Sequence, residues 1–259
     1  EDFVMTTDDT EGDPAILERS GSATEDFGFF QIAEGIHSVF ENVSLQNGTQ
    51  IAIRQVGATA NDTTMQILGC EFIDNVTVNT GPAGIAVSDS GTGASQLIIR
   101  DSLFDGHIGK AGSGGAVFCG MKTCLIDASS FKSNRIISNG LGAGVHSSAA
   151  ELYIVGSDFY QNRSTGGSAL YFDGGFIGIG KSTFAENLTT STAIPTYRGT
   201  ILVAAGTAQL THLTIVDNRV FDSDTDPGCA LHQNGTGSIA ISASIIYDNQ
   251  AIDVSFADR

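Results

Sequence analysis

The sequence has no tryptophan, only four prolines and four cysteines, and charged residues at just 16% of its 259 positions. No apolar stretch reaches the roughly 18 residues that a membrane-spanning helix needs, so membrane insertion is not expected. Signals for other helices are nearly absent as well. What remains is 32 glycines among short β-rich runs, a composition that predicts an all-β chain of many short strands and turns.

The charge balance is strongly acidic, with 29 acidic and 12 basic residues and a net charge of −17. A surface of this sign repels phosphate backbones, which argues against a nucleic-acid partner. It suits a solvated extracellular surface, a saline habitat or cation binding. The chain begins at Glu1 without a signal-like segment, as expected for a processed mature protein or a piece of a longer one.

One phrase recurs along the chain, a large apolar residue followed three places later by asparagine. Variant copies end in His107 and Gly48 instead of asparagine. The copies begin at Leu45, Phe72, Phe104, Phe131, Phe159, Phe184, Ile215 and Ile246. Their last residues are 27, 32, 27, 28, 25, 31 and 31 positions apart, and a period of this length indicates a solenoid.

A second column, mostly of small residues, lies two places before each apolar one, as Ser129 lies before Phe131. Residues two apart point to the same face of a strand, so both columns are expected to face inward. With a β-rich run before the phrase and a glycine-rich turn and short strand after it, each repeat is predicted to hold about three strands. A single repeat of this size cannot bury its apolar face, but a stack of such repeats can. The sequence therefore predicts a parallel β-helix, a solenoid of about eight coils.

The asparagines of the phrase are expected to form an inward ladder, because stacked carboxamides can hydrogen-bond to identical neighbours above and below. The members of this structural ladder are Asn75, Asn134, Asn162, Asn187, Asn218 and Asn249. In this interpretation they are ladder and turn formers without a further role.

The phrase together with a Gly-Gly-Ala-apolar turn resembles the repeat of the chlamydial polymorphic membrane proteins, which are surface adhesins with β-helical passenger domains. The best matches are residues 114–117 after Phe104 and residues 166–170 after Phe159. More broadly, the pattern resembles the right-handed, pectate-lyase-like β-helix superfamily, which implies a right-handed coil. That group includes lyases, epimerases and hydrolases of acidic polysaccharides as well as adhesins and fibre proteins, so the fold leaves the function open.

Residues 1–38 lie outside the repeat and are predicted to cap the β-helix formed by residues 39–259. Asp13 at an N-cap position and Pro14 behind it favour a short capping helix, with an irregular cap as the alternative. Apolar cover for the first coil would come from Phe27, Phe29, Phe30 and Ile32. Beyond Asn249 too few residues remain for a cap, so either a continuing chain or a partner is expected there.

The four cysteines divide into one predicted pair and two single thiols. Cys119 and Cys124 flank a tight turn and can come close enough to form a disulfide. Cys70 falls in the inward small column as a buried thiol, and Cys229, about five coils away from it, should also be unpaired. No Cys-x-x-Cys occurs and the five histidines are scattered, which disfavours zinc.

Seven of the twelve asparagines stand in Asn-x-Ser/Thr sequons, the acceptor signal for N-glycosylation. Asn61 and Asn234, between strands, are the predicted acceptors, with Asn47 as the third. The other reading is that a chain rich in serine and threonine generates sequons by composition. Three sequons belong to the ladder, where no sugar fits: Asn75, Asn162 and Asn187. Glycosylation would imply a eukaryotic secretory route.

An enzymatic alternative rests on the position just before the ladder. Glu186, Asp217 and Asp248 occupy it on three successive coils, and a backbone spacing of about 5 Å suits paired carboxylates. Arg163 and Arg219 each follow a ladder asparagine and add nearby bases. The opposing interpretation is a solvated edge beside a turn, in which case no residue is catalytic.

One acidic loop has the pattern of a metal site. Asp222, Asp224 and Asp226 alternate as carboxylates do in Ca²⁺ loops. The loop departs from the EF-hand pattern because Pro227 intervenes, the glycine comes one place late and no glutamate closes it. An ordinary acidic turn is the alternative, and no cofactor other than this Ca²⁺ is expected.

Two functions from different classes follow. The preferred one is a non-catalytic extracellular repeat protein, an adhesin or a module of a surface fibre that contacts extracellular proteins or glycan surfaces. Its β-helix ends could join copies into a homo-oligomer or filament. The alternative is a lyase, epimerase or hydrolase of acidic polysaccharides that uses Glu186, Asp217 and Asp248. Both place the protein outside the cell, secreted or at the cell surface.

Overall fold

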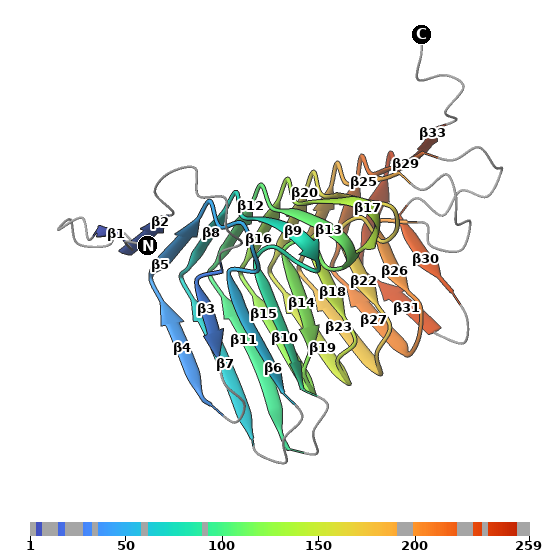
Figure 1. The fold of residues 1–259 in the computed structure, drawn as a ribbon. Helices are drawn as coiled ribbons and strands as arrows, with labels where there is room; N and C mark the ends of the chain where they lie inside the picture. The colour runs from blue at the N-terminus through green and yellow to red at the C-terminus, as the bar shows by residue number, and fades with distance from the viewer. Residues whose placement is uncertain are drawn as a thin grey trace, which may run out of the picture.

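The computed structural model describes residues 4–6, 15–18, 28–32, 36–57, 62–89, 93–190, 199–221, 230–234 and 238–252. Within them the chain is all-β, without a helix, and forms a parallel β-solenoid (Figure 1). The predicted fold class is therefore confirmed. The solenoid has about six turns, slightly fewer than the eight coils that the sequence predicts.

Four strands make up a full coil, where the sequence predicts about three. The chain passes in order through four sheets, which we number I to IV. The additional strand lies in sheet IV, directly after the ladder residue, where the sequence indicates only a glycine-rich turn. Glycines and polar residues hide its alternation, as in β17 (Arg135–Leu141). Hydrogen bonds to the equivalent strands of neighbouring coils form it despite this weak propensity.

The strands are distributed over the four sheets as follows. Sheet I contains β3 (Phe30–Ile32), β6 (Ile53–Gly57), β10 (Ile85–Asp89), β14 (Val117–Gly120), β18 (Val145–Ser147), β22 (Leu170–Phe172), β26 (Ile201–Val203) and β30 (Leu231–Gln233). Sheet II contains β4 (Ser38–Glu41), β7 (Thr63–Leu68), β11 (Ser95–Arg100), β15 (Thr123–Asp127), β19 (Glu151–Val155), β23 (Phe176–Gly180), β27 (Thr207–Thr211) and β31 (Ser238–Ser242). Sheet III contains β1 (Val4–Thr6), β2 (Ala15–Glu18), β5 (Val43–Gln46), β8 (Glu71–Ile73), β12 (Leu103–Asp105), β16 (Ser130–Lys132), β20 (Asp158–Tyr160), β24 (Thr183–Ala185), β28 (Thr214–Val216) and β32 (Ile245–Tyr247). Sheet IV contains β9 (Val76–Thr80), β13 (Ile108–Ser113), β17, β21 (Arg163–Ser164), β25 (Leu188–Thr189), β29 (Arg219–Phe221) and β33 (Gln250–Ile252).

The N-terminal segment is a strand where the sequence favours a capping helix. β2 pairs in parallel with β5 and antiparallel with β1, so it extends sheet III. That expectation was wrong because the open edge of a sheet offers backbone hydrogen bonds that outweigh a weak helix signal. Phe29 is buried in the core and Phe30 and Ile32 pack against it, while Phe27 lies outside the described residues. The division at residues 38 and 39 stays a prediction.

The corners of the coil depend on backbone with positive φ. The residue just before each ladder position is left-handed, with φ of 54° at Gln161, Glu186 and Asp217. A second left-handed corner separates sheet II from sheet III, for example at Asp101 with φ 49°. At the return to sheet I the residue is glycine, as at Gly114, where a Cβ atom would collide with the carbonyl oxygen of Val117. Gly114 belongs to the Gly-Gly-Ala signature, whose role is therefore steric.

The phenylalanine column forms one stack of parallel rings along the axis. The ring centroids of Phe131 and Phe159 lie 4.8 Å apart with 6° between planes, and those of Phe159 and Phe184 lie 4.7 Å apart. Phe72 and Phe104 continue the stack, and all five rings are fully buried. The spacing of neighbouring strands sets this distance between the parallel rings.

The asparagine column forms the predicted ladder. Asn162 Nδ2 donates to Asn187 Oδ1 of the next coil at 3.0 Å and to the carbonyl oxygen of Phe131 of the previous coil at 2.8 Å. Asn162 Oδ1 in turn accepts from the backbone N–H of Asn134 at 3.2 Å and from its Nδ2 at 3.0 Å. The same pattern runs on through Asn218 to Asn249. From Asn134 to Asn218, each buried carboxamide thus ties three successive coils together.

A second polar ladder runs along the small column. The backbone N–H of Ser129 donates to Ser157 Oγ at 3.2 Å, and Ser157 Oγ donates to the carbonyl oxygen of Val155 at 3.0 Å. Ser102 and Ser182 make equivalent bonds. These hydroxyls therefore provide hydrogen-bond partners for buried backbone groups at the corner between sheets II and III. The sequence pattern predicts only that the residues of this column are small.

Candidate functional site

The corner between sheets III and IV carries the acidic column that the enzymatic alternative requires. Glu186, Asp217 and Asp248 all have positive φ, which places them just outside the ladder. All three are exposed, whereas the asparagine that follows Glu186 and the one that follows Asp217 are fully buried. The corner therefore presents carboxylates to solvent on successive coils, as the column predicts.

An open depression of about 490 Å³ lies on this corner, lined by Gln161, Glu186, Leu188, Asp217 and Arg219. The structure thus brings Glu186, Asp217 and Arg219 together. Asp248 and Arg163 are not part of its lining. Only two of the three carboxylates of the alternative share one surface.

Hydrogen bonds organise one end of the depression. Gln161 Nε2 donates to Glu186 Oε2 at 2.9 Å and to the hydroxyl oxygen of Tyr160 at 3.0 Å. A hydrogen bond to Glu186 also raises the pKa of the Tyr160 phenol. Asp248 instead accepts from its neighbour Gln250 at 2.9 Å. The Glu186 carboxylate is therefore held in place, but by exposed groups.

Gln161 and Leu188 belong to the depression but were not among the predicted site residues. The repeat contains the signal for both. Gln161 occupies the same corner column as Glu186 and Asp217, and Leu188 occupies the same column as Arg219. Both residues would have been found by including the equivalent position of every repeat in the predicted site. A carboxylate pair beside an amide and a guanidinium can bind the hydroxyl groups of a polar ligand.

The metal prediction falls outside the described residues. Asp222, Asp224 and Asp226 are not described, so the Ca²⁺ loop stays a prediction. Elsewhere, the described ranges hold no group of three or more His, Cys, Asp or Glu side chains placed to bind a metal ion.

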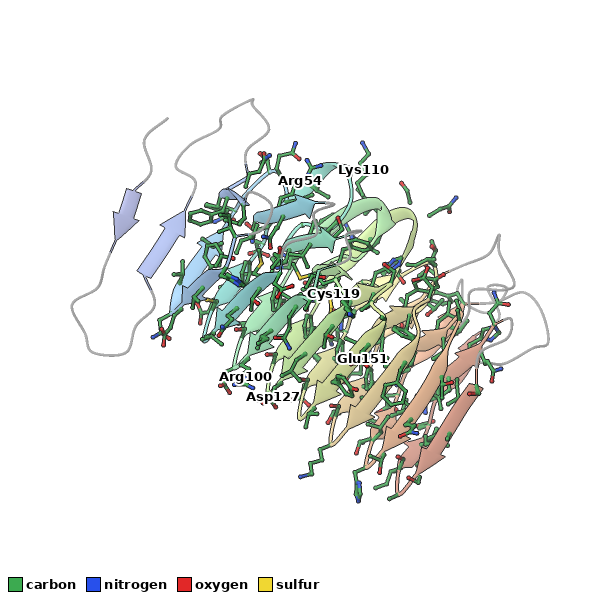
Figure 2. The ribbon with its side chains drawn as sticks, turned by 90° about the horizontal axis from the view of Figure 1, so that it is seen from below. Arg54, Arg100, Lys110, Cys119, Asp127 and Glu151 are labelled. Atoms are coloured by element: carbon green, nitrogen blue, oxygen red, sulfur yellow. A yellow bond between two sulfur atoms is a disulfide. The ribbon has the colours of Figure 1, made fainter. Side chains whose placement is uncertain are left out.

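The cysteines follow the prediction where they are described. Cys119 and Cys124 form a disulfide in the interior, with Cα atoms 6.7 Å apart (Figure 2). Cys70 is a buried thiol that donates to the carbonyl oxygen of Phe40 at 3.3 Å, and burial raises its pKa. Cys229 lies outside the described residues.

The predicted glycosylation acceptors differ in their surroundings. Asn47 is exposed at a corner with φ 58°, and Asn234 is half-buried. Asn61 lies outside the described residues. The sequons on the ladder are fully buried, at Asn75, Asn162 and Asn187. Modification of Asn47, Asn61 and Asn234 stays a prediction.

In the described part of the chain, oppositely charged side chains of neighbouring coils meet on the acidic surface. Arg100 and Asp127 face each other at the ends of β11 and β15, with Nε and Oδ2 3.9 Å apart (Figure 2). Lys132 and Asp105 make a similar contact at 3.8 Å between neighbouring coils. Exposed pairs of this kind contribute little to stability. The backbone hydrogen bonds between strands, the ladders and the ring stack, rather than charge pairs, therefore hold the coils together.

Comparison with known proteins yields one partial similarity. No protein-family model matches the chain, and no solved structure matches it. The chain is 30% identical over 151 residues to the metabotropic glutamate receptor-like protein R of Dictyostelium discoideum. This match covers 58% of the chain but only 8% of that relative's length. The structure itself defines the class, a parallel β-solenoid repeat protein. In the described part of the chain no helix has the length and apolar character to cross a membrane.

Proposed function

We propose that the chain is a non-catalytic module of an extracellular repeat protein, an adhesin or a structural part of a surface fibre. The observation that carries this proposal is the pair of interior ladders. The carboxamides from Asn134 to Asn249 and the hydroxyls of the small column bond to neighbouring coils. These polar groups hold coils in register and are closed to a substrate.

Several observations support an extracellular location. A disulfide such as Cys119–Cys124 is typical of oxidising compartments. The partial relative carries a receptor-like name, and receptors present domains outside the cell. The likeness of the phrase to that of the chlamydial surface adhesins supports an adhesive or structural role. The exposed sequon at Asn47 is consistent with passage through a secretory route.

Binding without turnover is the test of this proposal. Labelled protein is applied to an array of neutral and acidic glycans and to intact cells. We expect saturable binding with every glycan recovered unchanged. Release of unsaturated or reducing ends, abolished in Asp217→Ala, would overturn the proposal.

A second candidate is a polysaccharide-active site at the depression. The specific observation in its favour is that Glu186, Asp217 and Arg219 line one open surface. The exposure of the two carboxylates argues against it, since acid–base pairs usually rely on burial. Asp248→Ala is the matched control, because Asp248 shares the corner geometry but not the depression. This candidate requires that Asp217→Ala remove activity and that Asp248→Ala retain it.

A further inference from the structure

The two ends of the solenoid differ in how the interior columns stop. At the first coil, Val43 replaces the serine of the small column and Gly48 replaces the ladder asparagine. β2 also pairs along the edge of β5, and β1 runs antiparallel outside it. Both polar ladders therefore terminate at this end, and sheet III is closed by a strand of opposite direction.

The last coil retains the complete pattern. Ser244, Ile246 and Asn249 occupy the small, apolar and ladder columns. The strands β30, β31, β32 and β33 each stand last in their sheets. Among the described strands, all four sheets thus end at the same coil, with their backbone edges in one cross-section.

Interior side chains are uncovered at this cross-section. Ile246 is 47% exposed, whereas Ile215, directly below it in the previous coil, is 0% exposed. Ile241 is 41% exposed above Leu210, which is 1% exposed. By register these two isoleucines therefore continue interior columns, and they are uncovered at this end of the described coils. A surface of this kind becomes buried when another coil is stacked on it.

The polar groups at the same face show which coil would fit. Within the solenoid, the backbone N–H of Leu213 donates to Ser244 Oγ and that of Asn218 donates to Asn249 Oδ1, at 3.0 and 3.1 Å. The equivalent N–H groups of Ser244 and Asn249 have no such acceptors among the described residues. By analogy with the previous coil, the N–H of Ser244 would bond to a serine hydroxyl and the N–H of Asn249 to an asparagine carboxamide oxygen. The two acceptors would occupy the small and ladder columns of one repeat.

We infer that this face binds a parallel β-coil that carries the same phrase, with serine, an apolar residue and asparagine in the three columns. The inference goes beyond the proposed function, because it rests on the end face and holds whether or not the protein is catalytic. The first coil of a second copy does not fit. Val43 offers no hydroxyl, Gly48 offers no carboxamide, and β1 and β2 lie over the edge that would pair.

The test adds such a coil to the full chain. A copy of residues 166–190, which spans one four-strand coil of the solenoid, is fused after Ile252 in place of residues 253–259. The matched control carries the same residues in scrambled order. We expect the ordered extension to raise Tm by at least about 4 °C. We also expect amide exchange at Asn249 to slow at least about tenfold, since its N–H gains an acceptor.

Ile246→Ala provides a second readout that does not depend on the fusion alone. In the original chain this exposed side chain should change Tm by less than about 1 °C, and in the extended chain by several degrees. An extension that leaves Tm and Asn249 exchange unchanged, or that the scrambled control matches, overturns the inference. Head-to-tail oligomers of the unextended chain, seen by sedimentation velocity and lost in Ile246→Lys, also overturn it, because the first coil of a second copy would then be the partner.

Discussion

Nδ1 of His107 accepts a hydrogen bond from the backbone N–H of Asn75 at 3.2 Å, the place that a carboxamide oxygen fills in later coils. An accepting Nδ1 puts the proton of the neutral ring on Nε2. Nε2 is buried and has no partner among the described residues. Burial lowers the pKa of His107 to about 3. A single imidazole therefore interrupts an otherwise continuous amide ladder.

His107→Asn should stabilise the protein, by about 1–2 kcal/mol, because the carboxamide continues the ladder and removes the orphaned N–H. The pKa of His107 in the folded protein lies below the ordinary histidine value of about 6.5, so the folded state binds fewer protons than the unfolded state. The contribution of His107 to the free energy of unfolding is therefore fully present above about pH 6.5. It decreases toward pH 3, by up to about 1.4 kcal/mol per pH unit. The variant should lose this component of the slope.

Urea unfolding at pH 7.5, 6.5 and 5.5 measures the difference between the variant and the unmodified protein. His212→Asn is the control, since His212 is exposed at a corner. Equal pH slopes for His107→Asn and the unmodified protein would contradict the assignment.

Asn162→Leu should cost about 3 kcal/mol in the free energy of unfolding. The substitution removes the acceptor for Asn134 and the donor to Phe131, and it leaves these buried groups unpaired. Asn249→Leu removes equivalent bonds at the half-buried end of the ladder and should cost less than half as much. Chemical denaturation measures both, and equal costs would show that burial does not govern the ladder.

Phe159→Ala should destabilise the protein by about 3–5 kcal/mol, because it opens a cavity in the middle of the ring stack. Tyr153→Ala, in the same coil, is the control. Tyr153 is 36% exposed on the outer face of sheet II, and its removal should cost less than about 1 kcal/mol. Thermal and urea unfolding check both values, and a small effect of Phe159→Ala would disprove a continuous stack.

Asp217→Val should cost about 1–2 kcal/mol, because a β-branched residue is strained at φ 54°. Asp217→Asn should stay within about 0.5 kcal/mol, since asparagine tolerates this conformation. The pair separates backbone strain from loss of charge. If both variants lose the same stability in urea, the carboxylate rather than the corner is responsible.

Glycosylation should follow exposure when the chain is secreted from eukaryotic cells. We expect N-glycans on Asn47, Asn61 and Asn234 and none on Asn162 or Asn187 in folded protein, because a glycan at the ladder would prevent the coils from closing. Glycopeptide mass spectrometry of the monomeric fraction measures site occupancy. A glycan on Asn162 in native protein would contradict the ladder.

The depression shows how much of a surface can be predicted from equivalent positions in successive repeats. Glu186 and Asp217 could be placed on one surface from their equivalent positions, and the structure brings them together with Arg219. Gln161 and Leu188 could be found only by treating every column alike. The Tyr160–Gln161–Glu186 contacts could not be predicted, since they depend on side-chain rotamers at an exposed corner.

The sequence alone determined the repeat, the inward columns and the parallel stacking. Identical residues at a regular spacing can become neighbours in only one simple way, by coiling, and Phe131 and Phe159 accordingly face each other. A tight turn between two predicted strands likewise indicated the disulfide of Cys119 and Cys124. Only the tertiary structure decided that sheet IV exists, that residues 15–18 form a strand and that the small column is a hydroxyl ladder. These features arise from hydrogen bonds between coils, whose partners lie about one repeat away and leave no local trace in the chain.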